Sequence, residues 1–262
     1  MRQLFLFLLF CFTLFAAKPY NELELQRIAS LKQSTPFAFV VMGDNRDGED
    51  ILAQIIEKLN KSDILFAINN GDLTSDGDED EFKEYIDILK HSKKPILSNI
   101  GNHDIPFFFG DESNYKHFIG KPYYSFTFAN SYFIFVDNAN KVRVDSKQMR
   151  WLESELKKSQ KYKYRFVFIH VPLFDPREGG MRSGHSMKDI QNAKELSALF
   201  EKYHVTMIFA SHIHAYFKGR WGKTSYIITG GAGAPHTRDD GFYHYIIVRV
   251  GENGVEYMLN KL

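Results

Sequence analysis

This sequence of 262 residues has a single cysteine and no large excess of charge of either sign. Its one cysteine, Cys11, lies in an apolar N-terminal segment, so the rest of the chain offers no thiolate for a zinc site and suits an oxidising compartment. The 33 basic and 32 acidic residues nearly cancel. A general nucleic-acid footprint needs a basic excess or stripe, so the balance gives no sign of a nucleic-acid patch and disfavours a nuclease.

The chain begins with a short apolar segment of the kind that directs export. Residues 1–3 carry one positive charge, residues 4–15 are almost wholly apolar, and Ala16 and Ala17 are small. This pattern predicts a signal peptide over residues 1–17. An uncleaved N-terminal membrane anchor is the alternative, although the apolar run is shorter than the about 20 residues of a comfortable span. We therefore expect an exported protein, periplasmic or secreted, with no membrane span beyond the leader.

A polar lead-in over residues 18–34 precedes residues 35–262, where alternating strand-like and helix-like segments predict one α/β domain. Continuous apolar runs such as 37–42 are typical of strands that are buried on both faces. Apolar residues at helical spacing, as in 51–59, predict the helices between them. The expected strands are 37–42, 64–68, 95–100, 123–128, 132–136, 166–169, 205–210, 226–229, 243–250 and 255–259, and the expected helices are 51–59, a segment that opens at 76–81, 144–156 and 193–203.

Residues that can bind metals follow five of these strands. The clearest case is Gly101-Asn102-His103-Asp104, where a glycine lets the chain turn and an amide, an imidazole and a carboxylate follow. The other strand ends hold Asp44, Asp72, His170, His212 and His214. Ligand groups gather at the carboxyl ends of strands in α/β sheets, so we expect these side chains to lie close together.

The donor atoms of this set indicate the kind of ion that it binds. Carboxylate oxygens, an amide oxygen and neutral imidazoles suit Mn, Fe or Zn better than calcium. One histidine after a strand, such as His212 alone, is more often an ordinary loop residue. The whole set has no comparable structural explanation, because random placement would scatter these residue types over helices and surface. The sequence therefore predicts a site for divalent metal ions.

These motifs resemble those of the calcineurin-like metallophosphoesterase superfamily, whose pattern is D-x-H, G-D-x-x, G-N-H-D/E, an isolated histidine and G-H-x-H. The resemblance spans nearly the whole chain after the leader. It implies a four-layer αββα sandwich with mixed sheets and a site for two divalent metal ions (Mn, Fe or Zn) at one edge. It also implies that Asp72 bridges the ions, that Asp44 and His214 hold one of them, and that Asn102, His170 and His212 hold the other.

The resemblance implies catalytic roles, and the sequence also departs from the family pattern. His103 resembles the histidine that contacts the phosphate and protonates the leaving oxygen, with Asp104 orienting it. Arg46 stands where the family places the histidine of D-x-H, and its guanidinium stays protonated and cannot bind a metal. Ser75 stands where purple acid phosphatases place a tyrosine, so an iron–tyrosine site is unsupported. Ser211 replaces the glycine of G-H-x-H, which is a mild change.

We therefore expect a hydrolase that cleaves phosphate mono- or diesters of a small molecule, with a hydroxide that bridges the two ions as the nucleophile. Two divalent ions, two aspartates and a hydroxide leave a charge of about +1, which Arg46 raises to about +2, and this favours an anionic ester. The alternatives are a phosphate-binding protein with little turnover, for which Arg46 is the evidence, and a nuclease. The glycine-rich run 230–234 is a further candidate for close approach to the site, with a flexible turn as the alternative. Arg177, Arg182 and His185 are candidates for substrate contact, with a solvated loop face as the alternative.

Overall fold

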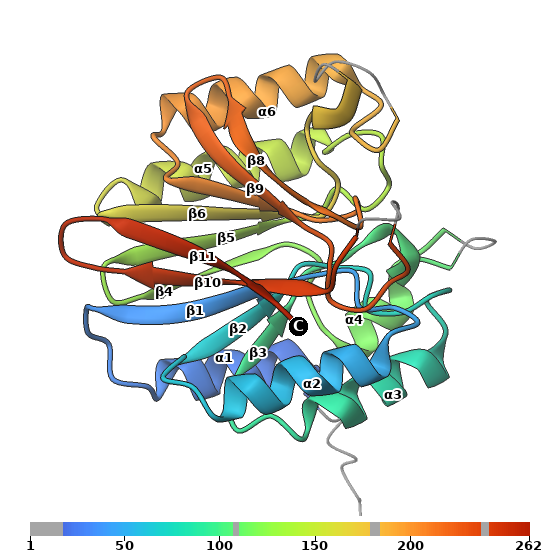
Figure 1. The fold of residues 1–262 in the computed structure, drawn as a ribbon. Helices are drawn as coiled ribbons and strands as arrows, with labels where there is room; N and C mark the ends of the chain where they lie inside the picture. The colour runs from blue at the N-terminus through green and yellow to red at the C-terminus, as the bar shows by residue number, and fades with distance from the viewer. Residues whose placement is uncertain (1–17, 107–109, 179–183, 237–240) are drawn as a thin grey trace, which may run out of the picture.

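The computed structural model describes residues 18–106, 110–178, 184–236 and 241–262. The predicted signal peptide and Arg182 lie outside the described residues. Within these ranges, no helix is long and apolar enough to cross a membrane. Two mixed sheets face each other and helices cover their outer faces, which confirms the expected four-layer αββα arrangement (Figure 1).

The first sheet has the strand order β11-β10-β1-β2-β3. Its strands are β1 (Phe37–Met42), β2 (Phe66–Asn69), β3 (Ile96–Ser98), β10 (His244–Val250) and β11 (Val255–Lys261). β1, β2 and β3 run parallel, and β10 pairs antiparallel with both β1 and β11. Because the first three strands are parallel and are joined by helices, their carboxyl ends lie at the same edge of the sheet.

The second sheet has the order β4-β5-β6-β7-β9-β8. Its strands are β4 (Tyr124–Phe128), β5 (Ser131–Val136), β6 (Tyr164–Ile169), β7 (Met207–Ala210), β8 (Tyr216–Trp221) and β9 (Thr224–Thr229). The inner strands β5, β6, β7 and β9 run parallel, while β4 and β8 pair antiparallel at the two edges. The carboxyl ends of β6 and β7 meet those of the first sheet at one side of the molecule (Figure 1).

Helices cover both outer faces, as Figure 1 shows for α2 and α3 on the first sheet and for α5 and α6 on the second. The helices are α1 (Tyr20–Ala29), α2 (Glu49–Asn60), α3 (Glu79–Leu89), α4 (Ser113–Phe118), α5 (Ser146–Ser159) and α6 (Ile190–Lys202), with 3₁₀ turns η1 (Asn102–Asp104) and η2 (Pro176–Glu178). In α2, Leu52, Ile55, Ile56 and Leu59 are buried on one face. Asp145 caps α5 by accepting a hydrogen bond from Gln148 N at 2.8 Å, which satisfies an amide that the helix itself cannot.

The space between the sheets is filled mainly by phenylalanine rings, of which the chain has 24. Phe39 of β1 is central: its ring centroid lies 5.6 Å from that of Phe66, and 5.3 Å from those of Phe133 and Phe166 in the second sheet. Its contacts with the second sheet are edge-to-face, an arrangement that aromatic rings favour. This packing fixes the two sheets against each other.

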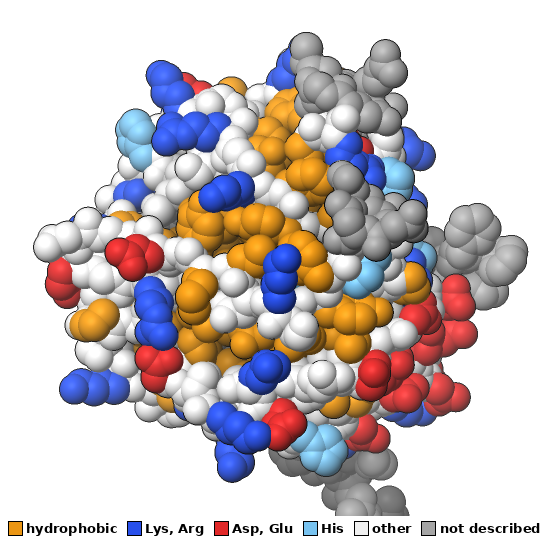
Figure 2. All heavy atoms as spheres, in the orientation of Figure 1, with side chains coloured by type: hydrophobic (Ala, Val, Ile, Leu, Met, Phe, Trp, Pro, Cys, Tyr) orange, Lys and Arg blue, Asp and Glu red, His pale blue; other side chains and the backbone are white. Residues whose placement is uncertain are grey.

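The expected elements are confirmed with shifted ends, and three further helices and strands were not among them: α1 in the polar lead-in, α4 and β8. β8 is an edge strand whose middle residues are exposed, so it lacks the apolar run of a buried strand. α4 has six residues, too few for a helical pattern to be recognised. On the face drawn in Figure 2, hydrophobic side chains spread over β8 to β11. Tyr257 and Met258 of β11 are exposed hydrophobic residues.

Candidate metal centre

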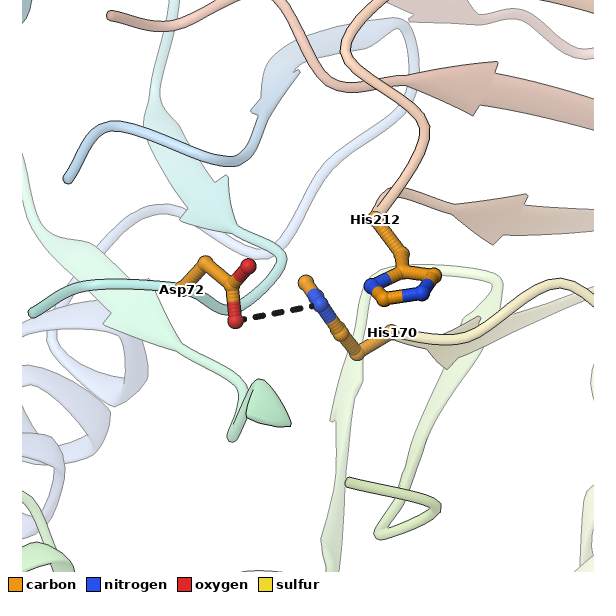
Figure 3. A group of neighbouring side chains, drawn as sticks. All are labelled: Asp72, His170 and His212. Atoms are coloured by element: carbon orange, nitrogen blue, oxygen red, sulfur yellow. Dashed lines mark ion pairs between the residues drawn. The ribbon is translucent and has the colours of Figure 1, made fainter. Parts of the chain in front are cut away.

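The strand ends bring five of the six expected ligands together in two groups that share one residue. The side chains of Asp72, His170 and His212 form one group, and those of Asp44, Asp72 and His214 form the other. Within each group the potential ligand atoms all lie within 4.8 Å of one another. Figure 3 shows the three side chains of the first group converging from different elements. Asp72 is thus placed to contact two neighbouring ions.

The backbone adopts an uncommon conformation at three of these positions. The φ angles of Asp44, Asp72 and His212 are 58°, 55° and 66°, in the left-handed region that few residues other than glycine adopt. Such conformations persist only where the surroundings impose them, and they cluster at functional sites. Here the amide of His212 donates to both carboxylate oxygens of Asp44, at 3.1 and 2.9 Å. This contact links the ligand loops of the two sheets.

Hydrogen bonds to the backbone orient the histidine rings toward the carboxylates. Nδ1 of His170 lies 2.9 Å from the carbonyl oxygen of Asn70, and Nδ1 of His214 lies 2.6 Å from that of Pro235. These contacts turn Nε2 of His170 to within 3.2 Å of Asp72, and Nε2 of His214 to within 3.5 Å of Asp44. A metal-binding histidine is typically held by its second ring nitrogen in this way.

The electrostatic environment separates the protonation states of the ligands. Burial opposes both charges of the Asp72–His170 pair, but the mutual attraction lowers the pKa of Asp72 and raises that of His170 to about 9. Burial and the charge of His170 hold the pKa of His212 well below its ordinary value, so this imidazole is neutral. A metal ion in this group would displace the proton of His170, because only the neutral imidazole binds.

Two buried atoms indicate that the donor set fits a metal. Among the described residues, Oδ1 of Asn102 has no hydrogen-bond partner, and Nε2 of His170 has only its ion pair with Asp72. Buried polar atoms without a partner are costly, and an ion that binds them removes that cost. The mixture of carboxylates, imidazoles and an amide oxygen suits Mn, Fe or Zn. The residues therefore fit two divalent ions.

His103 and Asp104 lie next to these ligands but interact differently from the expectation. The amide of His103 donates to Oδ1 of Asp72 at 3.0 Å, and its ring Nδ1 lies 2.7 Å from the carbonyl oxygen of Ser75. The buried carboxylate of Asp104 instead accepts from the amides of Leu73, Thr74 and Gly101. Thus Ser75 orients the ring of His103, and Asp104 joins the two loops that follow β2 and β3.

Arg46 lies beside the shared carboxylate. Its Nε is 4.0 Å from Oδ2 of Asp72 and, among the described residues, has no hydrogen-bond partner, while its NH1 group is 2.7 Å from Oδ2 of Asp47. The side chain is 20% exposed. Ser75 in turn bonds to the other oxygen of Asp47. The guanidinium is therefore held next to the centre and does not extend into solvent.

The other candidates divide between the site and its surroundings. The ring of His185 lies 5.6 Å from that of His212, so this loop reaches the centre. Arg177 forms two hydrogen bonds to the buried carboxylate of Asp175, at 3.0 and 2.7 Å. In the glycine run, a Cβ atom on Gly230 would lie 2.7 Å from Oδ2 of Asp44. The run therefore approaches the centre closely, as one of the two interpretations predicted.

Several contributing residues were not found from the sequence. Ser75 orients His103 through its carbonyl oxygen, and Asn70 orients His170 in the same manner. Asp47 holds Arg46 by an ion pair. A backbone carbonyl leaves no residue-type signal in a sequence. Only the position of Asp47, one residue after an unusual arginine, was available as a sequence signal.

Comparisons with known proteins agree with this geometry. The family model for calcineurin-like phosphoesterases matches residues 37–216. Purple acid phosphatase 22 of Arabidopsis thaliana is 25% identical over 201 residues, which cover 69% of this chain and 45% of that protein. The Fe(3+)-Zn(2+) purple acid phosphatase 12 of the same plant is 25% identical over 178 residues, covering 61% of this chain and 37% of that protein. The chain thus spans less than half the length of these curated relatives.

A solved structure shows the same fold. The purple acid phosphatase PPD1 from yellow lupin (Lupinus luteus) seeds superposes with a TM-score of 0.68 at 18% identity. The superposition covers 87% of this chain and 52% of that protein. At this level of identity the likeness concerns the fold alone.

Proposed function

Because the chain belongs to the calcineurin-like phosphoesterase family, we propose that it hydrolyses phosphate mono- or diesters of a small molecule with two divalent metal ions bound at its strand ends. The observation that carries this proposal is the sharing of Asp72 between two three-residue groups of ligands. A single structural ion would need only one such group. Two neighbouring ions suit a reaction in which both the attacking and the leaving oxygen must be stabilised.

In this proposal the ligands have separate roles. Asp72, His170, His212 and Asn102 hold one ion, and Asp44, Asp72 and His214 hold the other. When bound, the ions would supply Lewis acidity and a water that deprotonates near neutral pH. The family relative named for Fe(3+) and Zn(2+) supports the same pair of sites. Since Ser75 stands at the tyrosine position of purple acid phosphatases, Mn, Zn or Fe without a tyrosine ligand are the candidates.

His103 is placed to transfer a proton to the leaving oxygen. The carbonyl oxygen of Ser75 accepts the Nδ1 proton, so the opposite nitrogen, Nε2, carries the exchangeable proton when the ring is charged. The backbone amide of His103 donates a hydrogen bond to Oδ1 of Asp72, which holds this residue next to the shared carboxylate. Arg46 supplies a permanent positive charge beside the other carboxylate oxygen of Asp72, where it would bind a phosphate oxygen.

The balanced charge supports a small phosphate ester as substrate. On the face drawn in Figure 2, Lys and Arg side chains are dispersed among hydrophobic, acidic and uncharged groups. Acidic side chains gather at one side of this face, near α3, where a nucleic acid would be repelled. A nuclease is therefore the weaker alternative.

The test is turnover by the full chain, loaded in turn with Mn, Zn or Fe, on nitrophenyl phosphate and on bis-nitrophenyl phosphate. We expect hydrolysis of at least one ester, with Asp72→Asn abolishing it because both groups lose a ligand. Metal binding without turnover of any ester in a broad mono- and diester panel would instead favour a phosphate-binding protein. Absence of metal binding would overturn both.

Export is the second part of the proposal, and it is supported by the charged start, apolar core and small residues of segment 1–17. We expect cell fractionation to recover the protein outside the cytoplasm. Mass spectrometry of that protein would locate the cleavage site, which we expect near Ala17. A full-length product confined to the cytoplasm would contradict export.

A further inference from the structure

Asn70 connects the two sheets immediately before the shared carboxylate. Asn70 directly follows β2 of the first sheet and precedes Asp72 by two residues, and its side chain is buried. Its Nδ2 group donates to the carbonyl oxygens of Ile169 at 2.8 Å and of Phe209 at 3.3 Å, both at ends of strands in the second sheet. It also lies 3.3 Å from Oγ of Ser211. One amide group therefore contacts the ends of both β6 and β7.

The contacted residues are next to metal-ligand candidates. Ile169 immediately precedes His170, and Ser211 immediately precedes His212. The backbone carbonyl oxygen of Asn70 also accepts a hydrogen bond from Nδ1 of His170 at 2.9 Å. Asn70 thus contacts His170 and the residues that precede His170 and His212, and it lies two residues before Asp72. The ligand atoms of this group come from both sheets.

We propose that Asn70 is a positioning residue that sets the distance between Asp72 and the two histidines, and thereby the metal affinity of this group. The inference rests on the proposed function. Residues that orient metal ligands commonly change metal affinity by about 10- to 100-fold when they are mutated. Asn70 holds two histidine-bearing strand ends at once, so its loss would affect both.

The chemistry of the contact explains why asparagine stands here. Two buried carbonyl oxygens need a donor, which a carboxylate or an apolar side chain does not offer. The acceptor oxygen of Asn70 is used as well, since Nδ2 of Asn99 donates to it at 3.0 Å. A serine at 211 fits the same arrangement: its hydroxyl donates to the carbonyl oxygen of Thr229 and receives the Asn70 amide. Gly43 leaves room for this hydroxyl, because a Cβ there would lie 2.3 Å from it.

The test compares metal binding by the full chain and two variants. Asn70→Ala removes the link, and Asn192→Ala is the matched control: Asn192 is also buried, and it bonds to Val144 N beside α6, away from the ligand groups. Titration calorimetry with Zn or Mn should show one site weakened about 10- to 100-fold in Asn70→Ala and unchanged affinities in Asn192→Ala. The absorption spectrum of the Co(II)-loaded protein, which reports ligand geometry, should change only in Asn70→Ala.

Each outcome is decisive. Lower thermal stability of Asn70→Ala with unchanged metal affinities and an unchanged Co(II) spectrum would show a merely structural role and overturn the inference. If Asn70→Ala does not fold, Ser211→Ala is the second variant, because it removes the hydroxyl that the Asn70 amide contacts. Its metal affinity should fall about 2- to 10-fold through the loss of one such hydrogen bond. An unchanged metal affinity in Ser211→Ala would then overturn the inference. A wild-type protein that binds no metal would refute the proposed function itself, whereas binding by wild type and equal binding by Asn70→Ala refutes only the role of Asn70.

Discussion

At the scale of single residues, His103 is the proposed proton donor: its ring is held by the carbonyl oxygen of Ser75, and it belongs to neither of the two ligand groups found among the described residues. We expect His103→Ala to lower turnover by about 10²- to 10⁴-fold, the usual contribution of a general acid, without changing metal content. The loss should be smaller for nitrophenyl phosphate than for an alkyl phosphate, since nitrophenolate needs no protonation. Steady-state rates and elemental analysis of the same samples measure both effects. His117→Ala, on the exposed part of α4, serves as control.

A parallel fall of metal content and activity in His103→Ala would identify this residue as a ligand and contradict the assignment. Equal losses of turnover for nitrophenyl and alkyl phosphate would argue against proton transfer by His103. Such a result would remain consistent with a contact between His103 and the phosphate. The control variant should match wild type in both measurements.

Arg46 should make the two metal sites unequal. The group Asp44, Asp72 and His214 lacks the histidine that Arg46 replaces, and the guanidinium charge beside Asp72 further disfavours a cation there. Arg46→His should tighten this site about tenfold, or about 1.4 kcal/mol. The same change should raise KM about 10- to 100-fold, because a hydrogen bond to a charged group contributes about 1.5–3 kcal/mol.

Calorimetric metal titrations with and without inorganic phosphate test this asymmetry, and phosphate should strengthen the weaker site in wild type only. Arg249→His is the matched control. Arg249 pairs with exposed Asp63 near the amino-terminal end of β1, whereas the metal ligands follow the carboxyl ends of the strands. Two equally tight sites in wild type, insensitive to phosphate, would refute the role of Arg46.

Side-chain ligands leave a signal in the sequence that backbone contacts do not leave. Asp44, Asp72, His170, His212 and His214 were recognisable because their residue types are metal ligands and each follows an apolar run. The bond between Ser75 and His103 was not, because it uses a backbone oxygen. The role of Asp104 differs from the one that the family resemblance implied: its carboxylate accepts hydrogen bonds from the amides of another loop and not from the ring of His103.

At the scale of elements, the loop after β9 supports Asp44. A methyl group on Gly230 would lie 2.7 Å from Oδ2 of Asp44 and 2.3 Å from the carbonyl oxygen of Ile213. Gly230→Ala should therefore displace Asp44. The metal affinity of the site formed by Asp44, Asp72 and His214 should fall by about 10- to 100-fold. Gly254→Ala, where a new methyl group would meet nothing within 4 Å, is the control.

Calorimetry on both glycine variants measures the effect, and the control should keep wild-type affinities with a stability change within about 0.5 kcal/mol. Wild-type metal affinities in Gly230→Ala would show that the loop moves freely away from Asp44. The two sites should respond differently, because the contact reaches Asp44 and not His170.

The junction between β5 and α4 should make stability depend on pH. Asp137 follows β5, and its burial and the neighbouring carboxylate of Glu112 raise its pKa to about 8. The unfolded chain releases this proton near pH 3.9, so between about pH 4 and 8 the folded state binds one proton more. Stability contributed by this site therefore falls as pH rises through that window.

Asp137→Asn removes this titration, so its stability relative to wild type should increase between pH 5 and pH 8. Urea unfolding at both pH values measures the difference, and Asp87→Asn on the exposed face of α3 should show no such change. An Asp137→Asn variant whose stability relative to wild type is the same at both pH values would contradict the raised pKa.

Elements differ in how far the sequence predicts them. β1 and β6 were recognisable as apolar runs because both of their faces are buried. β8 was missed because it is an exposed edge strand with a glycine, and only pairing with β9 makes it a strand. Gly219 lies against the ring of Tyr226, a tertiary contact that local propensity does not encode. The arrangement of the strands in two sheets followed from the family resemblance and not from periodicity, and the strand order within each sheet was not predicted.

At the scale of the whole molecule, the metal ligands come from both sheets, so ion binding should stabilise the sandwich as a unit. The group of Asp72, His170 and His212 exists only when the sheets are packed, and the unfolded chain holds no comparable arrangement. At a free ion concentration of 100 Kd, one site should add about 2.7 kcal/mol to the free energy of unfolding. For a chain of this size that corresponds to a rise in Tm of about 5–11 °C.

Thermal unfolding of the full chain with and without saturating Mn or Zn measures this shift. Asp72→Asn is the informative variant, because the substitution removes a ligand from both groups and should abolish most of the rise. Because Asp72 also pairs with the buried His170, the substitution changes the metal-free stability, so the rise in Tm is measured for each protein against its own metal-free Tm. A rise in Tm as large in Asp72→Asn as in wild type would mean that the stabilising ions bind elsewhere, and the two strand-end groups would then not be the metal centre.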